Sequence, residues 1–230
     1  FSEEQKALYL SQLALVRDEA NTFMAEGQLA ENKIRILAGL TRLRQICCDP
    51  RLVMPNYEGE SAKLLRLLEY LETAKENGNR VVLFSQFTQM LALIQDELVK
   101  LGYDYFYLDG KTPNEERLAL TTRFNEGEKD LFLISLKAGG TGLNLTGGDT
   151  VILYDSWWNP AVESQATDRV HRFGQKNVVQ VIRMICGGTI EERISELQDK
   201  KRQLIDQVIS DEQQSLTSLS KEELMAILSE

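Results

Sequence analysis

Five short apolar runs constrain the fold of this 230-residue chain most strongly. They are RVVLF (80–84), YDYFYL (103–108), LFLIS (131–135), TVILYD (150–155) and VVQVIRMI (178–185). Several are apolar throughout, which is typical of parallel strands that are buried on both faces. Because helical patterns separate most of these runs, the alternation predicts an α/β domain with a mostly parallel sheet and helices on both of its faces.

Helical sequence flanks this α/β region on both sides. Residues 3–47 have apolar side chains at three- and four-residue spacing, and Gly27 is expected to separate two helices there. The chain becomes helical and acidic again after the α/β region. We therefore predict a helical insertion or linker over 1–58, an α/β lobe over 59–188 and terminal helices over 189–230.

Composition excludes some classes of protein. With 43% hydrophobic and 27% charged residues, the chain is typical of a globular protein, and no apolar run approaches the ~18 residues of a membrane helix. We expect no signal peptide. The net charge of -9 argues weakly against nucleic acid, but residues 131–189 contain five basic and four acidic side chains. Because the sequence starts at Phe1, we expect it to be a piece of a longer protein.

The cysteines do not predict a metal centre. Cys47, Cys48 and Cys186 do not have a zinc-ligand spacing, and the single histidine, His171, adds no ligand pair. We predict three reduced thiols and no metal ligands, as in a cytoplasmic or nuclear protein.

Four polar or glycine-containing segments directly follow predicted strands. They are SQF (85–87), DGKT (109–112), SLKAGGTGLNL (135–145) and DSWWNP (155–160). Ligands of open α/β sheets bind beyond the carboxyl ends of the strands, so these segments are expected to meet at one edge of the sheet.

The DGKT segment does not satisfy the spacing of a P-loop. A P-loop requires a glycine five residues before Gly110, and that position is Tyr105. A turn with Thr112 as a helix cap is the simpler interpretation. No Asp-Glu pair follows a strand either, so the chain is expected to lack its own residues for holding Mg-ATP.

The glycine-rich segment leaves two interpretations open. Gly139, Gly140 and Gly142 permit close approach to a phosphate, and Lys137 adds a positive charge, but a purely structural turn satisfies the same pattern. In the DSWWNP segment, Trp158 is the better candidate for an exposed aromatic ring that contacts a groove or a base.

An arginine pair follows in the segment QATDRVHRFGQ (165–175). Arg169 and Arg172 are expected on one face of a helix, with Gln165 one turn earlier. A local ion pair between Asp168 and Arg172 would explain one arginine. An anion clamp, in which both guanidinium groups bind phosphate, would explain both. The residues alone leave the two possibilities open.

The order of these motifs resembles a known family. VVLFSQFTQML, YLDGKT, LISLKAGGTGLNLTGGDTVILYDSWWNP and QATDRVHRFGQ closely resemble the later helicase motifs of the Swi/Snf-type ATPases of helicase superfamily two. The resemblance covers about residues 80–185, and LRQICCDPRLV (43–53) resembles the segment before that lobe. Gln175 after Gly174, where DEAD-box helicases have arginine, favours the Swi/Snf branch.

The resemblance implies a C-terminal RecA-like lobe with roles for individual residues. Arg169 and Arg172 would be arginine fingers. The ATP-binding set implied is Gln165, Gly140, Gly142 and Asn144, and the DNA-binding set is Ser85, Gln86, Thr112, Lys137, Thr141 and Trp158. Lys137 stands where many relatives have arginine, so a phosphate contact is retained but a bidentate one is not.

The resemblance also implies partners. ATP and Mg²⁺ would be held mainly by an N-terminal RecA-like lobe that precedes Phe1, and the whole protein would translocate on double-stranded DNA without separating its strands. Bound proteins or RNA polymerase are further candidate partners, and no membrane is expected. The location would be nuclear in a eukaryote or cytoplasmic and nucleoid-associated in a prokaryote.

Two alternatives to this motor remain at this point. The chain would otherwise be a non-catalytic binding module or a self-contained nucleotide enzyme. The isolated 230-residue piece is expected to hydrolyse little or no ATP.

Overall fold

A computed structural model describes residues 1–139, 142–155, 160–172, 174–205 and 219–229. The chain divides into two compact units. The α/β unit consists of Arg66–Asp155 and Ala161–Met184, and the helical unit contains Phe1–Leu65 and the chain from Ile185 onward. Within the described ranges, no helix has both the length and the apolar character needed to cross a membrane.

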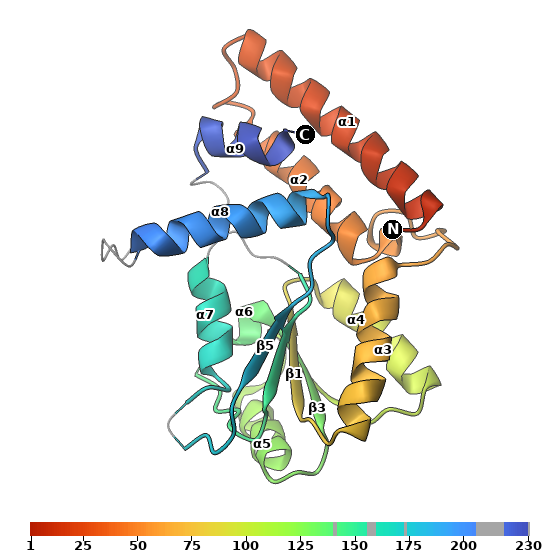
Figure 1. The fold of residues 1–230 in the computed structure, drawn as a ribbon, viewed down its shortest axis with the longest axis vertical. Helices are drawn as coiled ribbons and strands as arrows, with labels where there is room; N and C mark the ends of the chain where they lie inside the picture. Colours follow the sequence, from red (N-terminus) through yellow and green to blue (C-terminus); the bar gives the residue numbers. More distant parts are fainter. Residues whose placement is uncertain (140–141, 156–159, 173, 206–218, 230) are drawn as a thin grey trace. The chain divides into compact units, whose positions relative to one another are not determined.

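A five-stranded parallel sheet forms the centre of the α/β unit (Figure 1). The strand order is β2-β3-β1-β4-β5. Each strand coincides with one of the five apolar runs, with β1 extending one residue beyond its run to Ser85, so the predicted parallel α/β sheet is confirmed. The strands are β1 (Val81–Ser85), β2 (Phe106–Leu108), β3 (Leu131–Ser135), β4 (Thr150–Leu153) and β5 (Gln180–Arg183).

The burial of each strand follows from its position in this order. Central β1 pairs with β3 on one side and with β4 on the other, in registers that set Val81 beside Leu131 and Thr150. All residues of β1, β3 and β4 are buried, as expected for strands covered on both faces. Edge strand β5 is more open, and Val181 is exposed.

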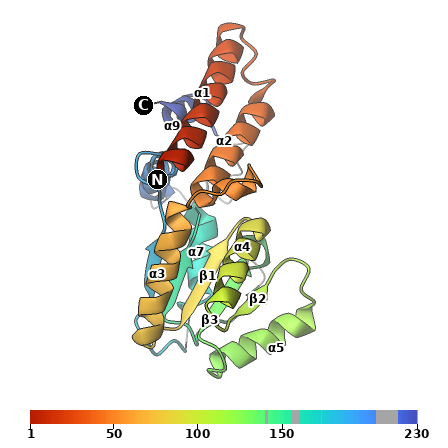
Figure 2. The same ribbon diagram turned by 90° about the vertical axis from the view of Figure 1, so that its right-hand side faces the viewer.

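Helices cover both faces of the sheet. They are α3 (Ala62–Glu76), α4 (Thr88–Lys100), α5 (Asn114–Asn125), α6 (Leu136–Gly139) and α7 (Pro160–Asp168). Figures 1 and 2 show α3 and α4 against one face and α6 and α7 against the other. The parallel strands require these crossovers, because a tight turn joins only antiparallel neighbours.

Arg80 joins two loops and the end of α5 at the edge of the sheet where the strands begin. Its guanidinium group donates to the backbone oxygens of Gly147 and Phe124, to Lys129 O at 2.7 Å and to Asp130 Oδ1 at 3.1 Å. The same group stacks over the Phe124 ring, 4.3 Å from its centroid. One side chain thus satisfies carbonyls from the loops before β3 and β4.

The helical unit is built from both ends of the chain. Its elements are α1 (Glu3–Ala25), α2 (Lys33–Cys48), the 3₁₀ helix η1 (Pro50–Leu52), α8 (Ile190–Ile205) and α9 (Lys221–Leu228). Gly27 has a φ of 70° between α1 and α2, as its predicted role as a separator requires. Side chains from α1, α2, α8 and α9 share one apolar core. The boundaries predicted at 58 and 188 therefore separate segments that pack together, and as domain limits they stay a prediction.

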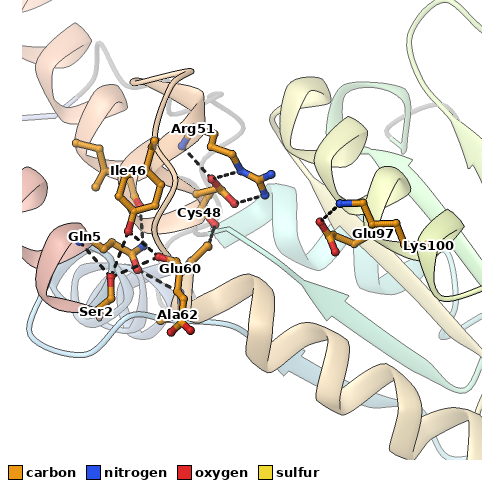
Figure 3. A network of polar contacts seen from close by, with 12 residues as sticks. Ser2, Gln5, Ile46, Cys48, Arg51, Glu60, Ala62, Glu97 and Lys100 are labelled. Atoms are coloured by element: carbon orange, nitrogen blue, oxygen red, sulfur yellow. Dashed lines mark hydrogen bonds and ion pairs between the residues drawn. The ribbon is translucent and has the colours of Figure 1, made fainter.

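A buried glutamine joins three segments of the helical unit. Gln5 on α1 donates from Nε2 to Ile46 O at 3.0 Å and accepts at Oε1 from Ala62 N at 3.1 Å (Figure 3). Both ends of the Gln5 amide are thereby satisfied, as burial of a polar group requires.

Replacement of Arg80 by methionine is expected to lower the free energy of unfolding by about 2–4 kcal/mol, because it leaves several carbonyls without their charged donor. Urea denaturation followed by circular dichroism measures the loss. Arg66→Met on α3 is the matched control, because its side chain is 79% exposed and forms an ion pair with the surface carboxylate of Glu69. Equal losses for the two variants would contradict this role of Arg80.

Candidate functional site

The carboxyl edge of the sheet brings two of the predicted segments together. Ser85 Oγ donates to Asp155 Oδ2, and Gln86 N donates to Asp155 Oδ1 at 3.1 Å. SQF thus meets the first residue of DSWWNP, as the shared strand ends predict. Ser85 and Asp155 are buried, whereas Gln86 is partly exposed. The Ser85 hydroxyl is therefore directed at Asp155, within the chain.

The DGKT segment forms a hydrogen-bonded turn after β2, and the Arg117 side chain of α5 donates to the carbonyls of Asp109, Gly110 and Thr112. Asp109 N donates to Thr112 Oγ1 at 3.1 Å, and Lys111 N donates to Asp109 Oδ1 at 2.8 Å. The Tyr107 hydroxyl donates to Asp109 Oδ2 at 2.8 Å, which lowers the pKa of the Asp109 carboxyl group. Burial, then the hydrogen bond to Asp109, raises the pKa of Tyr107 to about 12.

The predicted helix cap at Thr112 is wrong. Helix α5 begins at Asn114, and its N-cap is Pro113. The Thr112 hydroxyl accepts from Asp109 N instead, so it closes the turn rather than the first turn of the helix. Thr112 is nevertheless partly exposed.

Arg169 and Arg172 follow the end of a helix and do not lie within it. Helix α7 ends at Asp168, so the predicted helical face is wrong for both arginines. The reason is tertiary: the Arg169 carbonyl accepts from Leu145 N at 2.8 Å, and the Val170 carbonyl accepts from Gln175 Nε2 at 3.0 Å. These carbonyls are taken by donors outside a continuing helix. Gln165, on α7, is exposed.

The arginine segment is joined to the end of the glycine-rich segment. Arg172 Nη1 donates to Leu143 O at 3.2 Å and to Gly142 O at 3.5 Å. Gly142 has a φ of 79°, a conformation that other residues rarely adopt. Asn144, whose carbonyl accepts from Asn125 Nδ2 at 2.8 Å, is exposed. Gly142, Asn144 and the two arginines thus come together, although they are far apart in the sequence.

The Gln175 side chain holds the arginine segment against residues 146–148. Its Nε2 donates to Thr146 O at 3.0 Å and to Gly148 O at 2.8 Å, in addition to Val170 O. The sequence marked Gln175 as a family difference but gave it no structural role. A glutamine in a polar loop has no periodicity to identify its partners, so only the fold reveals them.

The electrostatics of the pair favour an anion. Burial lowers the pKa of Arg169, the positive charge of Arg172 lowers it further, and Asp168 partly opposes both effects. The two guanidinium groups are thus close enough to repel, and Arg172 is exposed. A phosphate group that accepts hydrogen bonds from both would relieve this repulsion.

The two sets of residues occupy opposite edges of the sheet. Strand β4 ends at the carboxyl edge, and α7 then returns the chain toward the edge where the strands begin (Figure 1). Arg169, Arg172 and Asn144 lie toward that second edge, whereas Gln86 lies at the carboxyl edge, as does the exposed Lys137 on α6 after β3. Gly140, Thr141 and Trp158 of the predicted site lie outside the described residues.

Comparison with known proteins defines first the class and then the family. The helicase conserved C-terminal domain matches residues 62–174. A putative ATP-dependent helicase/translocase of Bacillus subtilis is 41% identical over 229 residues, covering 97% of this chain and 24% of that protein. The SWI/SNF-related matrix-associated actin-dependent regulator of chromatin subfamily A member 1 of Mus musculus is 42% identical over 214 residues, covering 86% and 20%.

Solved structures agree with the sequence relatives. The Sulfolobus solfataricus SWI2/SNF2 ATPase C-terminal domain superposes with a TM-score of 0.76 at 30% identity, covering 99% of this chain and 93% of that one. The ATPase core of that organism in complex with dsDNA gives the same TM-score and identity, with 99% and 48% covered. This chain belongs to the SWI2/SNF2 ATPase family and is its C-terminal, RecA-like lobe. It spans about a fifth to a quarter of these two curated relatives.

Replacement of Gln175 by leucine is expected to lower the free energy of unfolding by about 1–3 kcal/mol, since three carbonyls lose their shared donor. Urea denaturation measures the change, and limited proteolysis near residues 170–176 should accelerate. Gln89→Leu, on the exposed surface of α4, is the matched control and should stay within about 0.5 kcal/mol of the parent. A Gln175 variant as stable as the control would show that the packing of the arginine segment against residues 142–148 does not depend on this amide.

Proposed function

We propose that this chain is the second motor lobe of a DNA-dependent ATPase that translocates on double-stranded DNA and remodels protein–DNA complexes. Membership of the SWI2/SNF2 family supports the motor, and the similarity to the Sulfolobus solfataricus SWI2/SNF2 ATPase core in complex with dsDNA supports the substrate. The alternatives, a binding module or a self-contained nucleotide enzyme, lack comparable support. Bound proteins or RNA polymerase remain candidate partners, in a nucleus or on a bacterial or archaeal nucleoid.

The observation that carries this proposal is the convergence of the two arginines on residues 142–145 after the end of α7. Leu145 N donates to the Arg169 carbonyl, and the Arg172 side chain donates to Leu143 O, so contacts within the chain hold both arginines in place. Preorganised positive charge stabilises the negative charge that develops on a transferring phosphoryl group. Mg-ATP, when bound, supplies that phosphoryl group, and Arg169 and Arg172 would orient it and stabilise its charge as arginine fingers.

The described residues of this lobe could bind the phosphates of ATP, but they do not form a site for Mg²⁺. The described part of the chain lacks a P-loop, and the DGKT turn is occupied by its own hydrogen bonds. ATP and Mg²⁺ would therefore be held mainly by a partner N-terminal lobe. Gln165, Gly142 and Asn144 would border the nucleotide on this side, together with Gly140.

The carboxyl edge is the proposed DNA-binding surface. Lys137, Gln86 and Thr112 have exposed or partly exposed side chains there, and the family resemblance assigns Thr141 and Trp158 to the DNA as well. Ser85, which is buried against Asp155, would hold the turn that presents Gln86. Separate edges for ATP and DNA suit a lobe that moves along a duplex without separating its strands.

In the intact protein, Arg169→Ala and Arg172→Ala should each lower DNA-stimulated ATP hydrolysis by roughly 10³-fold, because each removes a charge that opposes the developing phosphoryl charge. A coupled phosphate-release assay measures the rate, and DNA affinity should change little. Arg66→Ala on α3 is the control and should retain the parental rate. Hydrolysis that survives both arginine substitutions would show that the pair is structural.

Lys137→Ala should weaken duplex DNA binding and reduce the slope of log K against log salt concentration by about 0.9, the value for one phosphate contact. Fluorescence anisotropy over a salt series gives both quantities. Lys100→Ala, at the exposed end of α4 where Lys100 pairs with Glu97, is the matched control. An unchanged slope for Lys137→Ala would remove Lys137 from the DNA-binding surface.

A further inference from the structure

Two of the three thiols meet inside the helical unit. The Sγ atoms of Cys47, on α2, and Cys186, before α8, lie within 4.8 Å of each other and of a Glu191 carboxylate oxygen. The Cys186 thiol donates to Cys47 O at 3.5 Å. Cys186 therefore packs directly against the last turn of α2, although 139 positions separate the two cysteines.

The two thiols differ in their access to solvent. Cys47 is fully buried, whereas Cys186 is partly exposed. Burial, the contact with Cys186 and the charge of Glu191 together raise the pKa of the Cys47 thiol well above its usual value. A small oxidant thus reaches Cys186 first, while Cys47 remains protonated behind it.

A buried ion pair closes the site to a metal ion. Lys63 Nζ donates to the two carboxylate oxygens of Glu191 at 2.7 and 2.6 Å, and Cys186 N donates to Glu191 Oε1 at 2.9 Å. Burial alone would lower the pKa of Lys63, but the charge of Glu191 raises it overall, so Lys63 is a cation. A divalent metal bound by the thiols and Glu191 would lie beside this ammonium group, and the two positive charges would repel. The cluster is therefore suited to covalent chemistry between the two sulfurs.

We propose that Cys47 and Cys186 are a redox-responsive pair that forms a reversible disulfide with a hydroperoxide as oxidant. Cys186 Sγ attacks one oxygen of hydrogen peroxide, the O–O bond breaks, and the departing hydroxide takes the thiol proton, so that one sulfenic acid and one water form. Cys47 Sγ then attacks that sulfur, the S–O bond breaks, and the hydroxide leaves with the thiol proton as water. Two thiols and one peroxide thus yield one disulfide and two waters.

The disulfide would covalently close the chain around the α/β unit. All five strands lie between positions 47 and 186, so both ends of that segment would be tied within the helical unit. A cross-link over so long a loop restricts the unfolded chain strongly and stabilises the folded one. Oxidation would thereby hold α2 against the start of α8. This inference does not depend on the proposed motor function.

The test uses the reduced, metal-free chain treated with hydrogen peroxide at low protein concentration. Maleimide labelling after denaturation counts thiols, and peptide mapping identifies the cross-link. The parent should retain one thiol, that of Cys48, and show a Cys47–Cys186 peptide. Its Tm should rise by roughly 5 °C or more and return on reduction with dithiothreitol.

Three variants separate the pair from its neighbour. Cys48→Ala, the matched control, should still form the cross-link, whereas Cys47→Ala and Cys186→Ala should not. If a variant fails to fold, the peptide map of the oxidised parent chain shows whether Cys47 and Cys186 are cross-linked. A cross-link through Cys48, retention of all three thiols, or equimolar zinc binding that protects Cys47 and Cys186 would overturn the proposal.

Discussion

The pairing of β1 on both of its edges is the constraint on which the rest of the α/β unit depends. All five residues of this strand are buried, so backbone groups on both edges need partners from other strands. Parallel β3 and β4 provide them, and β2 and β5 are left at the outer positions. Arg80 fixes the loops where the strands begin, and the bonds from Ser85 and Gln86 to Asp155 fix the turn where β1 ends.

The same parallel topology separates the two sets of candidate site residues, which lie at opposite edges of the sheet. A strand that leaves the sheet at its carboxyl edge must return by a crossover, and α7 provides the crossover between β4 and β5. The arginines follow that helix, so they lie at the opposite edge from Lys137 and Gln86. In the proposed motor, movement of one edge against a nucleotide would displace the other edge along DNA. Hydrogen bonds between residues 169–175 and residues 142–148 keep the arginines in place.

The helical unit uses buried polar groups where the ends of the chain meet. Gln5 connects α1, α2 and the start of α3 through fully satisfied amide atoms. Lys63 and Glu191 form an ion pair with almost no solvent exposure, and the bond from Cys186 N supplies a further donor to the carboxylate. Such a pair offsets its desolvation cost only with good geometry, so it favours one arrangement of these segments over others. The two neighbouring thiols are held at short range by the same contacts.

The sequence by itself determined the five strands and the parallel α/β class, because the hydrophobic period is a local property. The role of the arginine pair stays a prediction. Tertiary structure alone decided the strand order and the local geometry of the site. Helix α7 ends at Asp168 because Leu145 N takes the Arg169 carbonyl, and Thr112 closes a turn because Asp109 N reaches its hydroxyl. Such hydrogen bonds join groups whose proximity depends on the fold, and no local pattern encodes them.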